Sequence, residues 1–294
     1  MRGPLLLAQT VGRIRSRVGA VFIGSHAVFR GKNLHAELGD AGWLDLYLFG
    51  ITGRRFSAPE LRLLEAIWTG TSYPDARIWN NRVAALAGTT RSTGNLGVSA
   101  SLAVSEAKIY GLSPSYRAIE FIVRLQSHIE AGGELRPLVE RELLEHRSVG
   151  GYGRPVNGGK DERIEPLLKL AQSLGLADGP YLKLAYAVDE YLSARARQRM
   201  NLAGFVAGLA ADIGLSPREH YFFLFPVFLA GMVPCYMDAA ERPEGTILPL
   251  PCNGVAYLGV AKRRWPHAGG PQAAPSHATP AGPQAAPSHR TPGA

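Results

Sequence analysis

The sequence predicts an all-α protein with a possible small hairpin near its N-terminus and a disordered C-terminal tail. Ahead of the tail, apolar residues recur with the helical period of about 3.6 residues, and the segments that carry this period start at capping residues. Strand-type alternation is seen at residues 18–29, with a weaker trace at 247–257. The 294-residue chain is 46% hydrophobic, which is enough for a sizeable core.

The first helices follow from local start and stop signals. Residues 57–60, Ser-Ala-Pro-Glu, form a capping box that leads into an apolar run reaching Ile67. A further helix is expected over residues 113–126, with Pro114 in its first turn and the glycine pair 132–133 after its end.

Three more helices are expected in the middle of the chain. They cover residues 161–174, 180–200 and 202–213, and Asn201 is well placed as the N-cap of the last one. Small residues gather on one face of that last helix, which permits the close approach of another backbone: Gly204, Ala207, Gly208 and Ala211.

A long uncharged segment follows a second capping box at residues 216–219. It runs over residues 221–237, which is close to the ~20 residues that cross a bilayer. Pro226 and Pro234 interrupt it, so we favour a buried helix of a helical protein and expect no membrane partner.

The tail over residues 266–294 has low complexity. The sequence of residues 270–280 is nearly repeated at 282–292, and such a segment is expected to be disordered because it buries too little apolar surface. The tail contains three histidines, from which we expect no metal site: His267, His277 and His289.

Composition excludes several function classes. The net charge of +8 arises from 32 basic and 24 acidic residues that are scattered along the chain, so no nucleic-acid partner is expected and small anionic ligands are weakly favoured. The two cysteines form neither a disulfide framework nor a zinc site, and the N-terminus does not resemble a secretory signal, which together favour the cytoplasm. Glycine-rich nucleotide loops and nucleophile elbows are also missing.

The segment over residues 150–163 is the most informative in the chain. It resembles the G-[FY]-G-H-R-V-[YF]…D-P-R segment of the citrate synthase family, in which the histidine and the next arginine meet the oxo-acid substrate. Arg154 and Pro155 stand in those two places. The frame of the loop matches at five positions: Gly151, Gly153, Val156, Asp161 and Arg163.

Other segments resemble the same family, or its citryl-CoA lyase members, in the family's order. They span residues 29–38, 48–61, 83–103, 201–205 and 231–238, so the likeness extends over roughly residues 18–265. It implies a large and a small helical domain, a homodimer or a heterodimer with an active homologue, and a ligand cleft between the domains. The large domain would comprise residues 1–113 and 214–265, and the small domain residues 114–213.

The resemblance also implies a Claisen-type condensation or its reversal. The family's catalytic groups for this reaction are replaced at the matching positions of this sequence. The family's base corresponds to Ala203, its first histidine to Ser113 or Pro114, and its second to Arg154. Its later histidine corresponds to Cys235. Losing these groups together removes the known mechanism, so standard citrate synthase activity is not expected.

Two hypotheses therefore stand side by side. In the first, the protein binds an acyl-CoA or an anionic carboxylic acid and performs altered condensation or lyase chemistry, with no cofactor beyond acyl-CoA as substrate. In the second, it is an inactive paralogue that acts as a ligand sensor or as the partner of an active homologue. The catalytic candidates are Arg154, Ser113 and Lys160. The candidate ligand-binding residues are Arg154, Asn157, Lys160, Asp161, Arg163 and Asn201.

For several of these residues a structural role is an open alternative. Arg154 could pair with Asp161 or Glu162, and a loop-stabilising role is favoured for Asp161 and Arg163. For Asn201 the helix cap is favoured.

Overall fold

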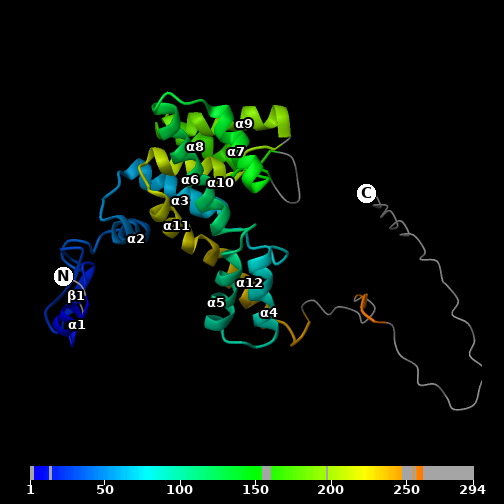
Figure 1. Ribbon diagram of the computed structural model, residues 1–294. Helices are drawn as coiled ribbons and strands as arrows, with labels where there is room; N and C mark the ends of the chain where they lie inside the picture. The colour runs from blue at the N-terminus through cyan, green and yellow to red at the C-terminus, as the bar shows by residue number, and fades with distance from the viewer. Residues whose placement is uncertain are drawn as a thin grey trace, which may run out of the picture. The chain divides into compact units, whose positions relative to one another are not determined.

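The protein is described by a computed structural model over residues 3–12, 15–153, 160–196, 198–246, 254 and 256–260 (Figure 1). The predicted all-α class is confirmed, because helices dominate the described residues. The chain divides into a compact unit, Met1–Pro249, and a second unit, Leu250–Ala294. The finer division into a large and a small domain stays a prediction, and the tail at 266–294 lies outside the described residues.

A short helix and the predicted hairpin come first. Helix α1 (Pro4–Thr10) precedes a three-stranded antiparallel sheet of β1 (Gly19–Phe22), β2 (His26–Phe29) and β3 (Lys32–Asn33). The register pairs Gly19 with Phe29 and Phe22 with His26. The weaker strand signal at residues 247–257 falls mostly outside the described part of the chain, and its described residues, 254, 256 and 257, are not in a strand.

Helices make up the rest of the first unit. They are α2 (Trp43–Thr52), α3 (Ala58–Thr71), α4 (Trp79–Thr89), α5 (Gly94–Ser105), α6 (Leu112–Glu130), α7 (Leu135–His146), α8 (Ile164–Ser173), α9 (Pro180–Ala196), α10 (Leu202–Asp212), α11 (Pro217–Leu224), the 3₁₀ helix η1 (Phe225–Phe228) and α12 (Leu229–Glu241). The predicted caps are present. Ser57 and Ser216 each form a capping box with the glutamate three residues later, and Asn201 caps α10.

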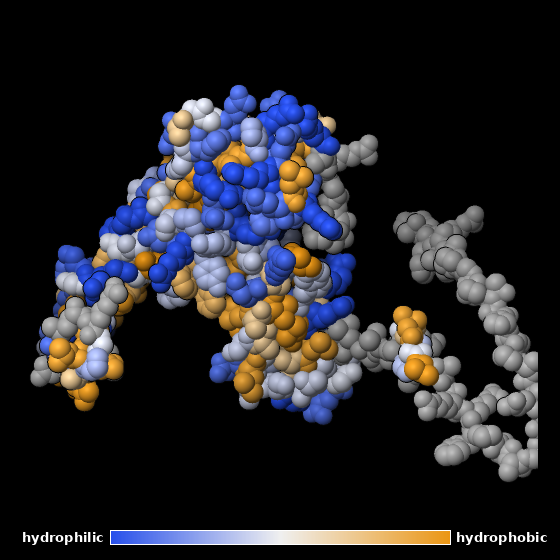
Figure 2. Space-filling model, viewed as in Figure 1, coloured by the Kyte–Doolittle hydropathy of each residue, from blue (hydrophilic) through white to orange (hydrophobic). Residues whose placement is uncertain are grey.

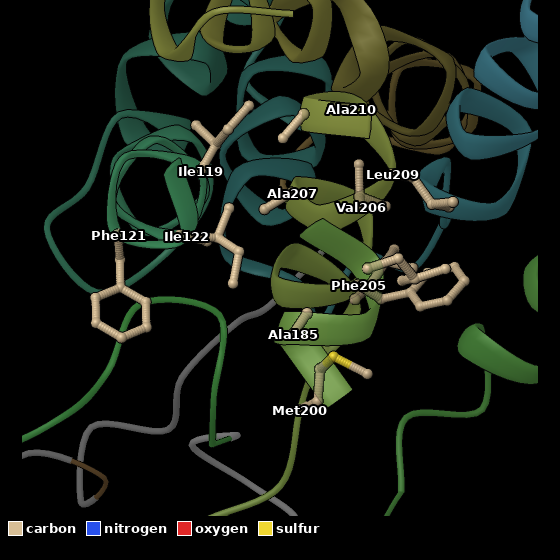
Figure 3. Close-up of a cluster of buried hydrophobic side chains, with 14 of the residues drawn as sticks. Ile119, Phe121, Ile122, Ala185, Met200, Phe205, Val206, Ala207, Leu209 and Ala210 are labelled. Atoms are coloured by element: carbon tan, nitrogen blue, oxygen red, sulfur yellow. The ribbon is translucent and has the colours of Figure 1, made fainter. Parts of the chain in front are cut away.

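The main core lies where α10 packs against α6 and α9. Figure 3 shows Ile119 and Ile122 of α6 directed toward Ala210 and Ala207 of α10. The small residues predicted on one face of α10 permit a close approach to α9, because a Cβ on Gly208 would lie 3.0 Å from the Cα of Leu182.

A second group of helices, α4, α5 and α12, packs with small residues at its contacts. A Cβ on Gly88 of α4 would collide with the carbonyl of Tyr236 in α12, and one on Gly97 of α5 would lie 2.7 Å from the Cβ of Ala87. These glycines set the distance between the three helices, which lie together beneath α6 and α10 in Figure 1.

The uncharged segment at residues 221–237 is not one regular helix. It is divided among α11, η1 and α12, with Pro226 in the 3₁₀ turn and Pro234 inside α12. The stretch Pro217–Glu241 has the length and composition of a membrane span, but core residues such as Phe223 and Met232 are completely buried in it. The cytoplasmic location stays a prediction.

Candidate functional site

A cleft of about 760 Å³ opens within the first unit. Its walls come from the α3–α4 connection, the start of α6, the start of α10 and the turn from α11 to α12. The lining residues are Ile67, Thr71, Ser72, Tyr73, Asp75, Arg77, Ile78, Trp79, Asn80, Asn81, Ile109, Tyr110, Gly111, Pro114, Ser115, Gly153, Arg163, Asn201, Leu202, Ala203, Val206, Leu224, Val227, Phe228 and Gly231.

One wall of the cleft is fixed by the cap of α10. Asn201 accepts hydrogen bonds from the backbone N–H groups of Ala203 and Gly204, at 2.9 and 3.4 Å, and its side-chain amide donates to the carbonyl of Gly153 at 2.7 Å. Residues 150–153 also approach α10 closely, because a Cβ on Gly204 would lie 2.5 Å from the carbonyl oxygen of Gly151. The positive φ of 87° at Gly151 favours glycine there as well.

A buried ion pair supports the same wall. The guanidinium of Arg163 donates to both carboxylate oxygens of Asp161, at 2.8 and 2.7 Å, and Asp161 accepts the backbone N–H of Leu202 at 2.9 Å. Burial acts to raise the pKa of Asp161, but the hydrogen bonds and charge of Arg163 and the N–H of Leu202 outweigh it and leave the pKa lowered. Asp161 is therefore a charged structural group at neutral pH.

The lining also contains a polar network that sequence patterns did not indicate. Tyr110 donates to Asn80 at 3.0 Å, and the amide of Asn80 donates to Ser105 at 3.1 Å. The amide of Asn81 donates to the carbonyl of Tyr73 at 2.5 Å. The adjacent asparagines at the start of α4 are both buried, and an Asn-Asn pair at a helix start was the signal available in the sequence.

The titratable groups of this cleft are poorly suited to proton transfer near neutral pH. Burial raises the pKa of Tyr110 to about 12, and burial also raises the pKa of Tyr73. Hydrogen bonds from the side chain and backbone of Arg77 lower the pKa of Asp75. A general base works best with a pKa close to the working pH, so none of these three groups suits the task.

Comparison with solved structures identifies the fold of this chain. A citryl-CoA lyase from Hydrogenobacter thermophilus matches 86% of this chain and 97% of its own, with a TM-score of 0.74 and 20% identity. The chain has a citrate synthase-like fold. An ATP citrate lyase from Methanothrix soehngenii (TM-score 0.67, 16% identity) covers 89% of this chain, which spans 45% of that one. A citrate synthase from Thermoplasma acidophilum (TM-score 0.59, 17% identity) covers 76% of this chain, which spans 59% of it. No known protein family and no curated protein matches the sequence.

Two positions that the resemblance aligned with catalytic groups of citrate synthase line this cleft, Ala203 and Pro114. Gly153, the last described residue before Arg154, is also among the lining residues. Cys235 is buried in α12 and is not among them. Ala203, which the resemblance aligned with the family's base, therefore lies in the lining of this cleft.

Of the other candidate residues, two line the cleft and the rest of the described ones do not. Arg163 and Asn201 line the cleft, whereas Asp161 lies buried behind it. Ser113 is half-buried in the first turn of α6, next to the lining residues 114 and 115. Lys160 is exposed and is not among the lining residues. Arg154 and Asn157 lie outside the described residues.

In the parts of the chain that the structure describes, no group of three or more His, Cys, Asp or Glu side chains is arranged to hold a metal ion.

Proposed function

We propose that this protein binds an acyl-CoA or a small carboxylic acid in the cleft and does not catalyse the standard citrate synthase reaction. The observation that carries the proposal is Ala203, which lines the cleft where the resemblance expects the carboxylate base. A methyl side chain cannot accept a proton, and Tyr73, Tyr110 and Asp75 have pKa values displaced away from neutrality.

The structural neighbours support the choice of ligand class. The ATP citrate lyase from Methanothrix soehngenii was solved in complex with citrate and coenzyme A, and the Thermoplasma acidophilum citrate synthase in a ternary complex with carboxymethyl coenzyme A and oxaloacetate. A cleft of about 760 Å³ is within the ~300–1,000 Å³ typical of small-molecule sites.

The test is a ligand screen with a variant that fills the cleft. Thermal shift and titration calorimetry would be carried out with CoA, acetyl-CoA, oxaloacetate and citrate, because a ligand that binds the folded state raises its stability by mass action. Ala203→Leu, which inserts three carbons into the cleft, is expected to weaken binding at least tenfold. Ala194→Leu, on the exposed surface of α9, is the matched control and should bind as the parent does. A flat response to the whole panel would contradict the proposal.

Altered condensation or lyase chemistry is the second candidate, favoured by one observation. Gly153 lines the cleft, and Arg154 follows it in the chain. A guanidinium can hold a carboxylate or an enolate, although it cannot transfer protons near neutral pH. Turnover of citryl-CoA, or of acetyl-CoA with oxaloacetate, that is lost in Arg154→Ala would establish this candidate and overturn the purely binding role.

A further inference from the structure

We infer that the ligand which this cleft selects is an acyl-CoA with an apolar acyl chain longer than acetyl, in preference to a di- or tricarboxylate. The inference rests on the proposed function, namely that the cleft binds an acyl thioester or an acid. It follows from how the charges, the hydrogen-bond donors and the apolar side chains of the described lining are arranged.

Both arginines of the described lining already have a carboxylate partner. Arg163 is bonded through two nitrogens to Asp161, at 2.8 and 2.7 Å, and its guanidinium lies over the ring of Tyr73 at 5.4 Å. Arg77 is bonded to Asp75 at 2.8–3.1 Å in an exposed ion pair, in which the side chain of Arg77 is 88% exposed. A ligand with two or three carboxylates would compete with buried Asp161 for Arg163, and the solvated Arg77 would add little to its binding free energy.

The uncharged donors of the lining are also committed to protein acceptors. The hydroxyl of Ser115 donates to the carbonyl of Gly111 and that of Thr71 to the carbonyl of Ile67, at 3.0 and 2.6 Å. Tyr110, Asn80 and Asn81 donate within the network described above. Among the side chains of the described lining, the indole N–H of Trp79 is the donor group that has no such bond. A polycarboxylate held by these described side chains would therefore have to displace internal hydrogen bonds, at a cost for each group left unpaired.

Apolar side chains provide the remaining surface of the cleft. The ring of Tyr110 lies edge-on to Trp79 at 5.3 Å and packs against Phe228 at 6.3 Å. Ile109 is 68% exposed, and Trp79 is 43% exposed. When a ligand covers large apolar groups that are exposed at the mouth of a cleft, the removal of their surface from water makes the free energy of binding more favourable.

The measurable consequence is a dependence of affinity on acyl chain length. Burial of one methylene is expected to lower Kd about fourfold, so each two-carbon extension should lower it about 15-fold while the chain stays in the cleft. Titration calorimetry would compare acetyl-, butyryl- and hexanoyl-CoA with citrate and oxaloacetate. Ile109→Ser is expected to reduce the gain from butyryl to hexanoyl at least threefold. Leu144→Ser, at an 84% exposed position on α7, is the matched control and should keep the full gain.

The outcomes separate this inference from the function on which it rests. Affinity that rises with chain length, with citrate and oxaloacetate binding more weakly than hexanoyl-CoA, would support it. Equal affinity for the three thioesters, or tighter binding of citrate or oxaloacetate, would overturn it and leave the proposed binding function in place. Failure to bind any compound of the panel would overturn both.

Discussion

His220 is a residue whose environment makes the whole fold sensitive to acid. It is completely buried in α11, and neither ring nitrogen has a hydrogen-bond partner within the described structure. Burial lowers the pKa of His220 from 6.5 to about 3. The unfolded chain therefore takes up a proton below pH 6.5 while the folded protein does not. Stability consequently falls as the pH drops from 6.5 toward 3, by at most about 1.4 kcal/mol per pH unit.

Replacing His220 with leucine is expected to remove this dependence. His220→Leu should flatten the free energy of unfolding between pH 6.5 and pH 4, and should stabilise the protein at pH 5, because two unpaired nitrogens are replaced by apolar carbon. Urea unfolding at a series of pH values measures the effect. His35→Leu, at an exposed position, should retain the parental slope. A parental slope in His220→Leu would show that other groups govern the acid response.

At the scale of elements, the contact between Gly151 and Gly204 positions residues 150–153 against α10. Gly204→Ala would place a Cβ 2.5 Å from the carbonyl oxygen of Gly151, so the loop or the helix must move. We expect a loss of about 1–3 kcal/mol in the free energy of unfolding and weaker ligand binding, because Asn201 and Gly153 line the cleft beside this contact. Chemical denaturation and calorimetry measure the two effects.

Gly70 in α3 is the matched control for that substitution. A Cβ there would lie 3.8 Å from a methyl group of Leu167, which is an ordinary contact. Gly70→Ala should therefore stabilise the protein by about 0.4–1 kcal/mol. If Gly204→Ala also stabilised it, the loop would have enough freedom to adjust, and close approach would not define its position.

The elements also show which features the sequence could predict. Capping is local, so Ser57, Asn201 and Ser216 identified helix starts correctly. The division of the 221–237 segment at Pro226 was not predicted in detail, because apolar periodicity does not distinguish a 3₁₀ turn from an α-helix.

The cleft was harder to predict than the helices. Tyr110 and Asn80 are 30 positions apart and meet through tertiary packing, so the Asn-Asn pair at the start of α4 does not by itself indicate which side chain it meets. The position of Ala203 in the cleft was accessible because the family resemblance aligned separated segments. The citrate synthase-like fold that the resemblance implied is confirmed, and the roles of Arg154, Asn157 and Lys160 stay predictions.

At the scale of the whole molecule, the exposed apolar surface of α4, α5 and α12 bears on the predicted dimer. Leu96 is 66% exposed, Met237 53% and Val233 40%, and Figure 2 shows hydrophobic residues gathered over these helices. The large hydrophobic cluster of the first unit does not include residues of these three helices. A second copy of the chain that covered this surface would remove it from water.

We therefore predict a homodimer that buries this surface. Its molar mass would be measured by light scattering coupled to size-exclusion chromatography at micromolar protein concentration. Leu96→Glu should raise the dimer dissociation constant at least tenfold, since it replaces an apolar contact with a charge that must lose its hydration. Leu144→Glu, on the exposed surface of α7, should leave the mass unchanged. A monomeric parent protein would contradict self-association, and a monomer that acquired a dimeric mass when mixed with an active homologue would favour the heterodimer. A monomer that still bound ligand would also separate binding from assembly.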